Sequence, residues 1–310
     1  MTTPGVLAAA SNAASSDGKW HLRYPGGNAP LGAALASTAL ASAAATGALT
    51  TGGGGGGGGT IYLQEDYNTY PSGNITSITS ALSTMGYSAV IFQTAGDIQI
   101  LGRSSMPAAL LSNPSFPSGK TQICLFSLDA LEDESRLTWT GFPNSTTRVV
   151  SWSWWEYHDN ANGGLQKFMR AGNYLNGVIG ANRGIDAIIG LDAAGVTTLF
   201  SNSANMHGFP DQPFGTLTGW PPGLNFFERV DNLPTDTSST YSSEFYVNDV
   251  LQGSTSGIQI YDTTAQAAVG WQLWDFGGWA SGSGTFPIKR YMCAARIASQ
   301  RQGVWPMSAI

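Results

Sequence analysis

The chain has 310 residues and a formal net charge of −6, and only 11% of its residues are charged, against about 25% in ordinary soluble domains. No basic cluster is longer than Lys289-Arg290, which argues against binding nucleic acid through phosphate contacts. Neutral polar surfaces are buried against neighbours at low desolvation cost. The composition therefore favours a homo-oligomer or a larger assembly, although a sugar-binding surface would have the same composition.

The N-terminus, Met1-Thr2-Thr3-Pro4-Gly5, lacks the basic start and apolar stretch of an export signal. No segment supplies the roughly 20 strongly apolar residues that span a bilayer. We therefore expect no signal peptide and no membrane partner, with assembly in the cytoplasm of the producing or host cell.

An unbroken glycine run, Gly52–Gly59, divides the chain into an arm (1–51), a linker (52–59) and a body (60–310). Such a run has no side chains to bury and loses much backbone freedom on ordering, so it acts as a flexible tether. The arm is rich in Ala, Ser and Thr, and its segment 31–49 is Ala-rich, with Leu31 and Leu35 spaced four apart. We expect this arm to be extended or partly helical, and disordered unless a partner covers it.

The body reads as almost entirely β, with short runs of Val, Ile, Tyr, Phe and Trp separated by turn residues. The predicted strands lie near 60–64, 88–93, 97–102, 121–128, 147–158, 165–171, 185–191, 195–200, 225–230, 242–250, 257–261, 268–275 and 288–297. Short helical turns are predicted within 75–85 and 106–111. So many strands in about 250 residues favour an all-β fold of two stacked antiparallel sheets in a single domain.

The segment 149–157 predicts the strongest strand. Its alternation places Val150, Trp152 and Trp154 on one face, suited to a sandwich core. The opposite face carries Ser151, Ser153, Trp155 and Tyr157. This mixture of polar and aromatic residues is typical of a solvated concave sheet surface.

Four segments resemble the concanavalin A-like lectin/glucanase jelly roll, in the variety found in polysaccharide-lyase-like and phage-encoded proteins. These segments are the acidic-aromatic opening 62–73, the tryptophan strand with the following 163–170 (Gly-Gly-Leu-Gln-Lys-Phe-Met-Arg), the late strand region 243–253 and the closing strand 290–297. The resemblance implies a jelly-roll sandwich over most of 60–298. Because this fold serves lectins, lyases, hydrolases and inert shell proteins, it implies no single function.

The catalytic sets of that fold are incomplete. The Glu-x-Asp-x-Glu spacing of its retaining hydrolases is missing, and the contiguous Glu132-Asp133-Glu134 reads as a solvated turn. The Gln-Ile-His strand of its lyases is replaced by Gln122-Ile123-Cys124. As substitutes, Tyr157, His158, Lys167 and Arg170 would converge if their two strands paired. The alternative is that they are ordinary polar residues at strand ends.

No cofactor is implied by any motif. Asp159, Asn160 and Asn162 offer oxygen ligands for calcium, but they lack the EF-hand register, and a plain hairpin turn is the alternative. The two cysteines, Cys124 and Cys293, lie in apolar strand-like runs and are expected to be buried free thiols.

Aromatic residues give the strongest positive signal for a ligand, because sugar C–H faces stack on aromatic rings while amides and carboxylates bond the hydroxyls. The candidate glycan-binding residues are Trp155, Glu156, Tyr157, Asn160, Gln272, Trp274, Asp275 and Trp279. The alternative is that these tryptophans fill a broad core or a contact between copies.

The sequence thus favours a non-enzymatic structural protein of a particle, such as a bacteriophage virion. Residues 1–59 would attach it to other subunits, and the sandwich would be displayed as a capsid decoration, tail fibre or adhesin that binds cell-surface or secreted polysaccharide. Two alternatives stay open: a polysaccharide lyase or glycoside hydrolase of the same fold, and a free soluble lectin.

Overall fold

The computed structural model describes residues 59–74, 87–91, 98–130, 133–139, 148–158, 166–172, 186–191, 196–202, 212–218, 222–258, 273–280 and 286–309. The arm 1–51 and the helical segment predicted within 75–85 lie outside these residues. Within them, the chain is almost entirely antiparallel β-structure, as predicted. No described helix is long and apolar enough to cross a membrane.

The strands in chain order are β1 (Ile61–Glu65), β2 (Gly73–Asn74), β3 (Tyr87–Ile91), β4 (Ile98–Gly102), β5 (Gln122–Leu128), β6 (Glu134–Trp139), β7 (Val149–His158), β8 (Gln166–Gly172), β9 (Asp186–Leu191), β10 (Val196–Asn202), β11 (Gln212–Thr218), β12 (Gly223–Asn232), β13 (Tyr241–Val247), β14 (Val250–Ile258), β15 (Leu273–Ala280) and β16 (Ile288–Ala298). The helical elements described are α4 (Ala108–Leu111) and the 3₁₀ turns η2 (Arg103–Ser105) and η3 (Met307–Ala309).

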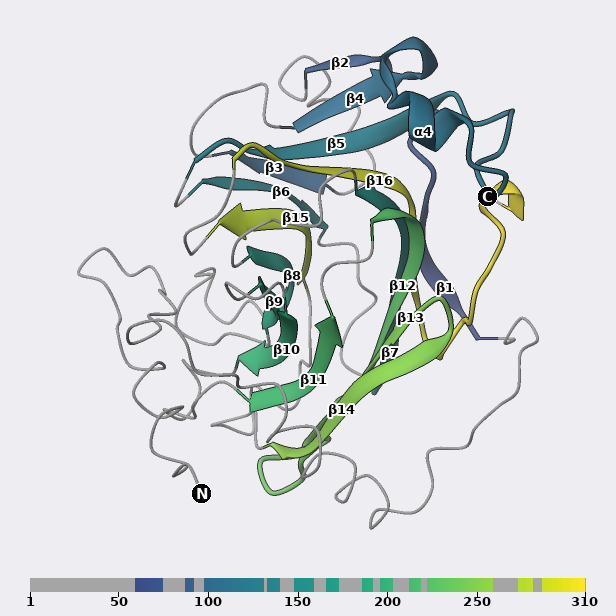
Figure 1. The fold of residues 1–310 in the computed structure, drawn as a ribbon. Helices are drawn as coiled ribbons and strands as arrows, with labels where there is room; N and C mark the ends of the chain where they lie inside the picture. Colours follow the sequence, from purple (N-terminus) through teal and green to yellow (C-terminus); the bar gives the residue numbers. More distant parts are fainter. Residues whose placement is uncertain are drawn as a thin grey trace.

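All described pairings form one continuous path, β2-β4-β5-β16-β7-β12-β13-β14-β11-β10-β9-β8-β15-β6-β3, with β1 also paired to β16. The sheet folds back on itself into two layers (Figure 1). The first layer runs from β2 to β14 and includes β1, and the second runs from β11 to β3. The expected jelly-roll sandwich is therefore confirmed.

Bonds between strands that are not neighbours in the path join the two layers. The Ser135 hydroxyl of β6 donates to the Ser127 carbonyl of β5 at 2.7 Å, and Arg290 of β16 donates to the Gly277 carbonyl of β15. On the core side of the first layer, Trp154 stacks on Phe227 with ring centroids 5.3 Å apart. The main core thus lies between the layers.

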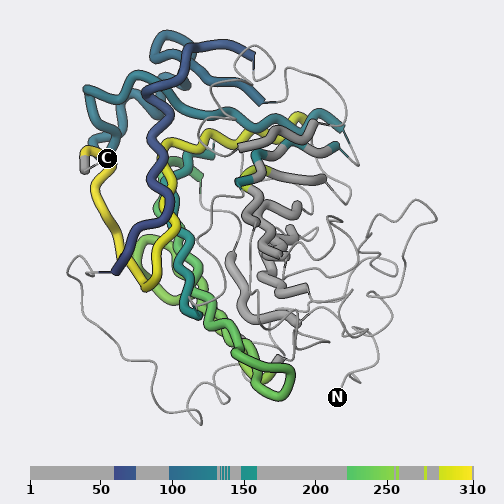
Figure 2. Tube along the Cα trace, turned by 180° about the vertical axis from the view of Figure 1, so that it is seen from behind, coloured from purple at the N-terminus to yellow at the C-terminus, as the bar shows by residue number. Residues whose placement is uncertain are grey.

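A second apolar cluster covers the outer side of the first layer. It joins Trp155, Tyr157 and Phe226 to α4 and to the C-terminal segment 299–309. Figure 2 shows that segment running beside β1 on this side of the sheet, where the Ser299 amide donates to the Thr60 carbonyl at 2.9 Å. The first layer is therefore covered on both sides.

Three sequence-based boundaries are wrong. The stretch 242–250 contains a hairpin turn at Asn248 and Asp249, both with positive φ (50° and 68°), which separates β13 from β14. The expected solvated turn at 132–134 does not hold for its described residues, because Asp133 is fully buried and accepts the Asp129 amide at 2.7 Å, and β6 begins at Glu134. β15 ends at Ala280, five residues beyond the predicted end of its strand.

Candidate functional site

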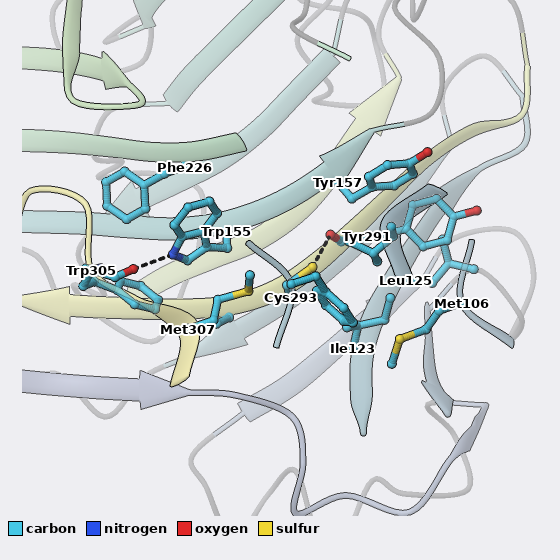
Figure 3. Packing of buried hydrophobic residues seen from close by; sticks show 13 residues of the cluster. Met106, Ile123, Leu125, Trp155, Tyr157, Phe226, Tyr291, Cys293, Trp305 and Met307 are labelled. Atoms are coloured by element: carbon cyan, nitrogen blue, oxygen red, sulfur yellow. Dashed lines mark hydrogen bonds between the residues drawn. The ribbon is translucent and has the colours of Figure 1, made fainter. Parts of the chain in front are cut away.

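The face of β7 that was predicted to be solvated is buried. Trp155 and Tyr157 are 8% and 7% exposed, and Ser151 and Ser153 are fully buried. The Trp155 Nε1 donates to the Trp305 carbonyl at 2.7 Å (Figure 3). Trp305 follows Trp155 by 150 residues, so a local sequence pattern could not reveal the cover. Trp155 and Tyr157 are packing residues rather than groups presented to a glycan.

The opposite face of β7 belongs to the main core. Glu156 is fully buried, and its carboxylate accepts bonds from Arg290 Nε at 2.7 Å and Nη2 at 2.6 Å. Trp154 Nε1 donates to the same carboxylate at 2.9 Å. His158 is 2% exposed. Glu156, predicted as a polar contact to sugar, is therefore a buried partner of an ion pair.

The four residues considered for catalysis do not converge by strand pairing. β7, which carries Tyr157 and His158, pairs with β12 and β16 in the first layer. β8, which carries Lys167 and Arg170, pairs with β15 and β9 in the second layer. The condition for a shared site, direct pairing of these two strands, is not met.

The second layer has a core side and an opposite side. Ser135, Leu137 and Trp139 of β6 and Phe276 of β15 are at most 4% exposed, which identifies the core side. Because successive residues of a strand alternate between faces, the intervening positions lie on the other side. Register places Glu134 opposite Trp279, Arg136 opposite Gly277 and Thr138 opposite Asp275 on that side.

β8 adds two basic positions to the same side. Arg170 lies opposite Asp275, and Lys167 lies opposite Trp279. In a regular strand, residues three apart would lie on opposite faces. A register shift between Lys167 and Met169, seen also against β9, brings both onto one face.

We call these positions the β6–β15–β8 face. Its members are Glu134, Arg136, Lys167, Arg170, Asp275 and Trp279. Asp186 of β9 lies beside it, opposite Arg170. Trp274 pairs with Trp139.

Four of the sequence-based candidates thus share one face of the second layer: Lys167, Arg170, Asp275 and Trp279. Three others on or beside it were missed, namely Glu134, Arg136 and Asp186. Glu134 and Arg136 were missed because β6 was not predicted. The alternation Glu-Ser-Arg-Leu-Thr-Trp over 134–139 was the available signal.

The residue types at these positions include ones that bind sugars and uronates. Guanidinium and ammonium groups pair with carboxylates, acidic groups accept bonds from hydroxyls, and an indole stacks on apolar sugar faces. Among the described positions on this side of β3, β6, β15, β8 and β9, none is a His, Cys or Tyr. The groups in that described set that can move a proton are therefore carboxylates and Lys167.

Asn160 and Gln272, predicted to contact glycan, and the calcium candidates Asp159, Asn160 and Asn162 lie outside the described residues. Within the described part of the chain, no group of His, Cys, Asp and Glu side chains is arranged to hold a metal ion.

Other buried titratable groups have structural roles. Glu65 accepts the Tyr67 amide at 2.7 Å and the Tyr70 hydroxyl at 2.9 Å, and burial raises the pKa of its carboxyl. Both cysteines are buried free thiols, as predicted. Burial raises the pKa of the Cys293 thiol to about 12 and that of Cys124 well above its usual range, which makes both poor nucleophiles.

No protein-family model matches the chain, and no curated protein matches it by sequence. Solved structures share its fold. A PL-14 alginate lyase from Aplysia kurodai aligns over 77% of this chain and 98% of its own, with TM-score 0.51 and 9% identity. The alginate lyase Aly36B aligns over 78% and 98%, with TM-score 0.51 and 12% identity. A variant of Aly36B bound to alginate tetrasaccharide aligns over 78% of this chain and 98% of its own, with TM-score 0.50 and 13% identity. At such identities the likeness shows the fold alone.

Proposed function

We propose that this chain is a non-enzymatic glycan-binding protein that holds acidic polysaccharide on the β6–β15–β8 face. The observation that carries the proposal is the register, which gathers Arg136, Lys167 and Arg170 on the side away from the core. Uronate carboxylates suit this set, because a guanidinium binds a carboxylate through parallel hydrogen bonds. Trp279 supplies the aromatic surface that a sugar ring requires.

Cleavage is not favoured. A lyase must neutralise the uronate carboxylate and also remove a proton from the neighbouring carbon, which needs a positioned base. The predicted groups for that step, Tyr157 and His158, are buried in the first layer. The β6–β15–β8 face has no His or Tyr among its members, so a base on this face would have to be a carboxylate or Lys167, and we propose that these groups bind the polymer without cleaving it.

The test is a panel of acidic and neutral polysaccharides assayed for binding by calorimetry. We expect acidic polymers to bind, and K167Q and R170Q each to weaken binding about tenfold, the loss of one charge-assisted contact. Lys289→Gln is the matched control, because Lys289 is a lysine on a first-layer strand. Absence of binding to every acidic polymer, or equal weakening by K289Q, would refute the proposal. Ultraviolet absorption from an unsaturated product would show that the protein cleaves the polymer as a lyase and would refute the non-enzymatic proposal.

We further propose that residues 1–59 attach the body to a larger particle, such as a phage virion, on which the sandwich is displayed as a decoration, fibre or adhesin. This rests on the composition of the arm and the glycine run. Deletion of 1–59 is expected to abolish incorporation into the particle while leaving glycan affinity unchanged. A full-length chain that stays monomeric and is never found in particles would instead favour the free lectin.

A further inference from the structure

Large apolar side chains are exposed at one end of the first layer. Among the side chains whose burial the structure describes, the exposed large apolar ones belong to four residues, each between 42% and 62% exposed: Ile61, Val250, Leu251 and Val304. Ile61 begins β1, Val250 and Leu251 begin β14, and Val304 lies in the C-terminal segment. Scattered apolar residues are normal on a surface, whereas their gathering at one end indicates an interface.

Contacts between the β13–β14 turn and the C-terminal segment bring these elements together. Arg301 donates to the carboxylate of Asp249, the residue before Val250. Its guanidinium carbon also lies 3.9 Å from the ring centroid of Tyr246. Leu251 pairs with Tyr246, and cross-strand partners share a face, so Leu251 lies on the side that Arg301 covers. The turn and the start of β1 lie at the same end of the layer (Figure 1). We call the four exposed residues the linker-end patch.

The glycine linker joins the body at this same end. The Ser299 amide donates to the Thr60 carbonyl at 2.9 Å. Gly59 lies so close to Gln300 that a Cβ on this glycine would be 2.5 Å from the Gln300 Cγ. The next residue, Arg301, is the one that binds the β13–β14 turn. The linker therefore ends beside the residues that carry the patch.

The arm segment 31–49, on the other side of the linker, has a composition that suits this patch. No charged residue occurs between Arg23 and Glu65. The large apolar side chains of the segment are four leucines: Leu31, Leu35, Leu40 and Leu49. The nearest charges of the body, Arg301 and Asp249, are paired with each other. Contact between the segment and the patch would thus bury apolar surface without stripping water from an unpaired ion.

The length of the linker favours docking within one chain. Its eight glycines have a root-mean-square span of about 16 Å. Val304 follows Gln300 by four residues, so the two lie at most about 14 Å apart. A short flexible linker gives an effective concentration in the millimolar range. A second copy at micromolar concentration is roughly a thousandfold more dilute, so the segment of the same chain outcompetes it.

We propose that the linker-end patch is the docking surface for segment 31–49 of the same chain. The free protein then holds its arm on the body until another surface displaces it. The inference goes beyond the proposed function, because neither glycan binding nor attachment to a particle requires contact between arm and body.

The experiment is hydroxyl-radical footprinting of the full-length chain, which reports the exposure of individual side chains. The variant L31S/L35S/L40S/L49S removes the apolar groups of the segment and leaves the body untouched. We expect Leu251 and Val304 to be oxidised about threefold faster in this variant, as when about two thirds of wild-type molecules are docked. V6S/L7S is the matched control, because it removes apolar residues of the arm outside the segment, and it should leave both rates unchanged.

Two further variants change the body and the linker. V250T/L251T keeps β-branched residues at these strand positions but adds polar groups to the patch, so Leu31 and Leu35 should be oxidised faster. Q252T, on the same strand, is its control and should have no effect on the arm. Insertion of eight more glycines doubles the linker and should lower the ratio of docked to free arm about threefold. The arm and linker variants decide the matter even if V250T/L251T does not fold.

Equal oxidation of Leu251 in the wild type and in the leucine variant, or an equal rise in V6S/L7S, would overturn the inference. Protection that disappears on dilution, together with a halving of the mass in solution, would assign the patch to a second copy and would overturn it as well. Because the footprint requires no ligand, failure of the protein to bind any glycan would refute the proposed function alone.

Discussion

Substitution of Trp305 by alanine tests whether the C-terminal segment is an integral cover of the first layer. The Trp305 side chain is 5% exposed and packs edge-on against Phe226, with the ring centroids 5.8 Å apart. The guanidinium carbon of Arg296 lies 4.2 Å from the centroid of the Trp305 ring. Its Nε1 donates to the Ser153 hydroxyl at 2.9 Å. The bond from Trp155 is to the Trp305 backbone carbonyl, which survives in alanine.

The expected cost follows from these contacts. Truncating a buried tryptophan to alanine costs about 3–5 kcal/mol, a range that already includes the lost aromatic packing. We therefore expect W305A to lower the free energy of unfolding by about 4 kcal/mol. For a body of this size, that corresponds to a fall in melting temperature of about 8–16 °C.

Guanidinium denaturation monitored by tryptophan fluorescence measures this loss. The neighbouring Val304 is 46% exposed, so V304A is the control and should change stability by less than about 0.5 kcal/mol. A loss below about 1 kcal/mol in W305A, or one equal to that of V304A, would show that the segment does not cover β7. The prediction of a solvated Trp155 face would then be restored.

Three further predictions concern particular residues. Burial raises the pKa of both Glu65 and Glu228 above 4.5 in the folded state, so the folded protein binds more protons than the unfolded chain as pH rises past 4.5. The free energy of unfolding should therefore fall as pH rises from about 4.5 through the raised values, and fall less steeply in E228Q, as denaturation at stepped pH would measure. Cys124 and Cys293 should react with a thiol reagent only after unfolding, and rapid labelling of the native protein would contradict their burial. Asn248→Val should lower the free energy of unfolding by about 1–3 kcal/mol, because φ is 50° at this position and Asn248 Oδ1 accepts the Phe226 amide at 2.9 Å. Ser238→Ala, in an exposed turn, is the control and should change the unfolding free energy little.

Much of the fold was predictable because its signals are local. The period-two pattern of β7 correctly separated Trp152 and Trp154 from Trp155 and Tyr157. It could not identify what covers each face, because Trp305 and Met106 come from distant parts of the chain. Alternation establishes that a strand has two faces, whereas burial of either face is decided by tertiary contacts.

The errors at β6 and at the β13–β14 turn have specific causes. Three contiguous acidic residues before Ser135 resemble a loop, yet Asp133 is buried because its carboxylate accepts a backbone amide. Asn248-Asp249 is a hairpin signal that was read as part of a strand, although both residue types tolerate positive φ.

The site was only partly predictable. Lys167, Arg170, Asp275 and Trp279 were named from the sequence, but their common face depends on irregular pairing of β8 with β9 and β15. A one-residue shift moves a residue to the other face of a sheet, so no single-strand pattern could have joined Lys167 to Arg170. Trp155 and Tyr157 were misjudged for the opposite reason, since their strand is regular but covered.

Binding of a polyanion by a chain with net charge −6 has a kinetic consequence. At long range the protein repels the polymer, while Arg136, Lys167 and Arg170 attract it only near contact. Screening acts on the distant charges first, because the Debye length falls from about 30 Å at 0.01 M salt to about 8 Å at 0.15 M. The association rate should therefore rise with salt over this range, measured by stopped flow with an acidic polysaccharide. A rate that falls steadily from the lowest salt would mean that attraction dominates the approach, as for a basic surface, and that a cationic region larger than this one face guides the ligand.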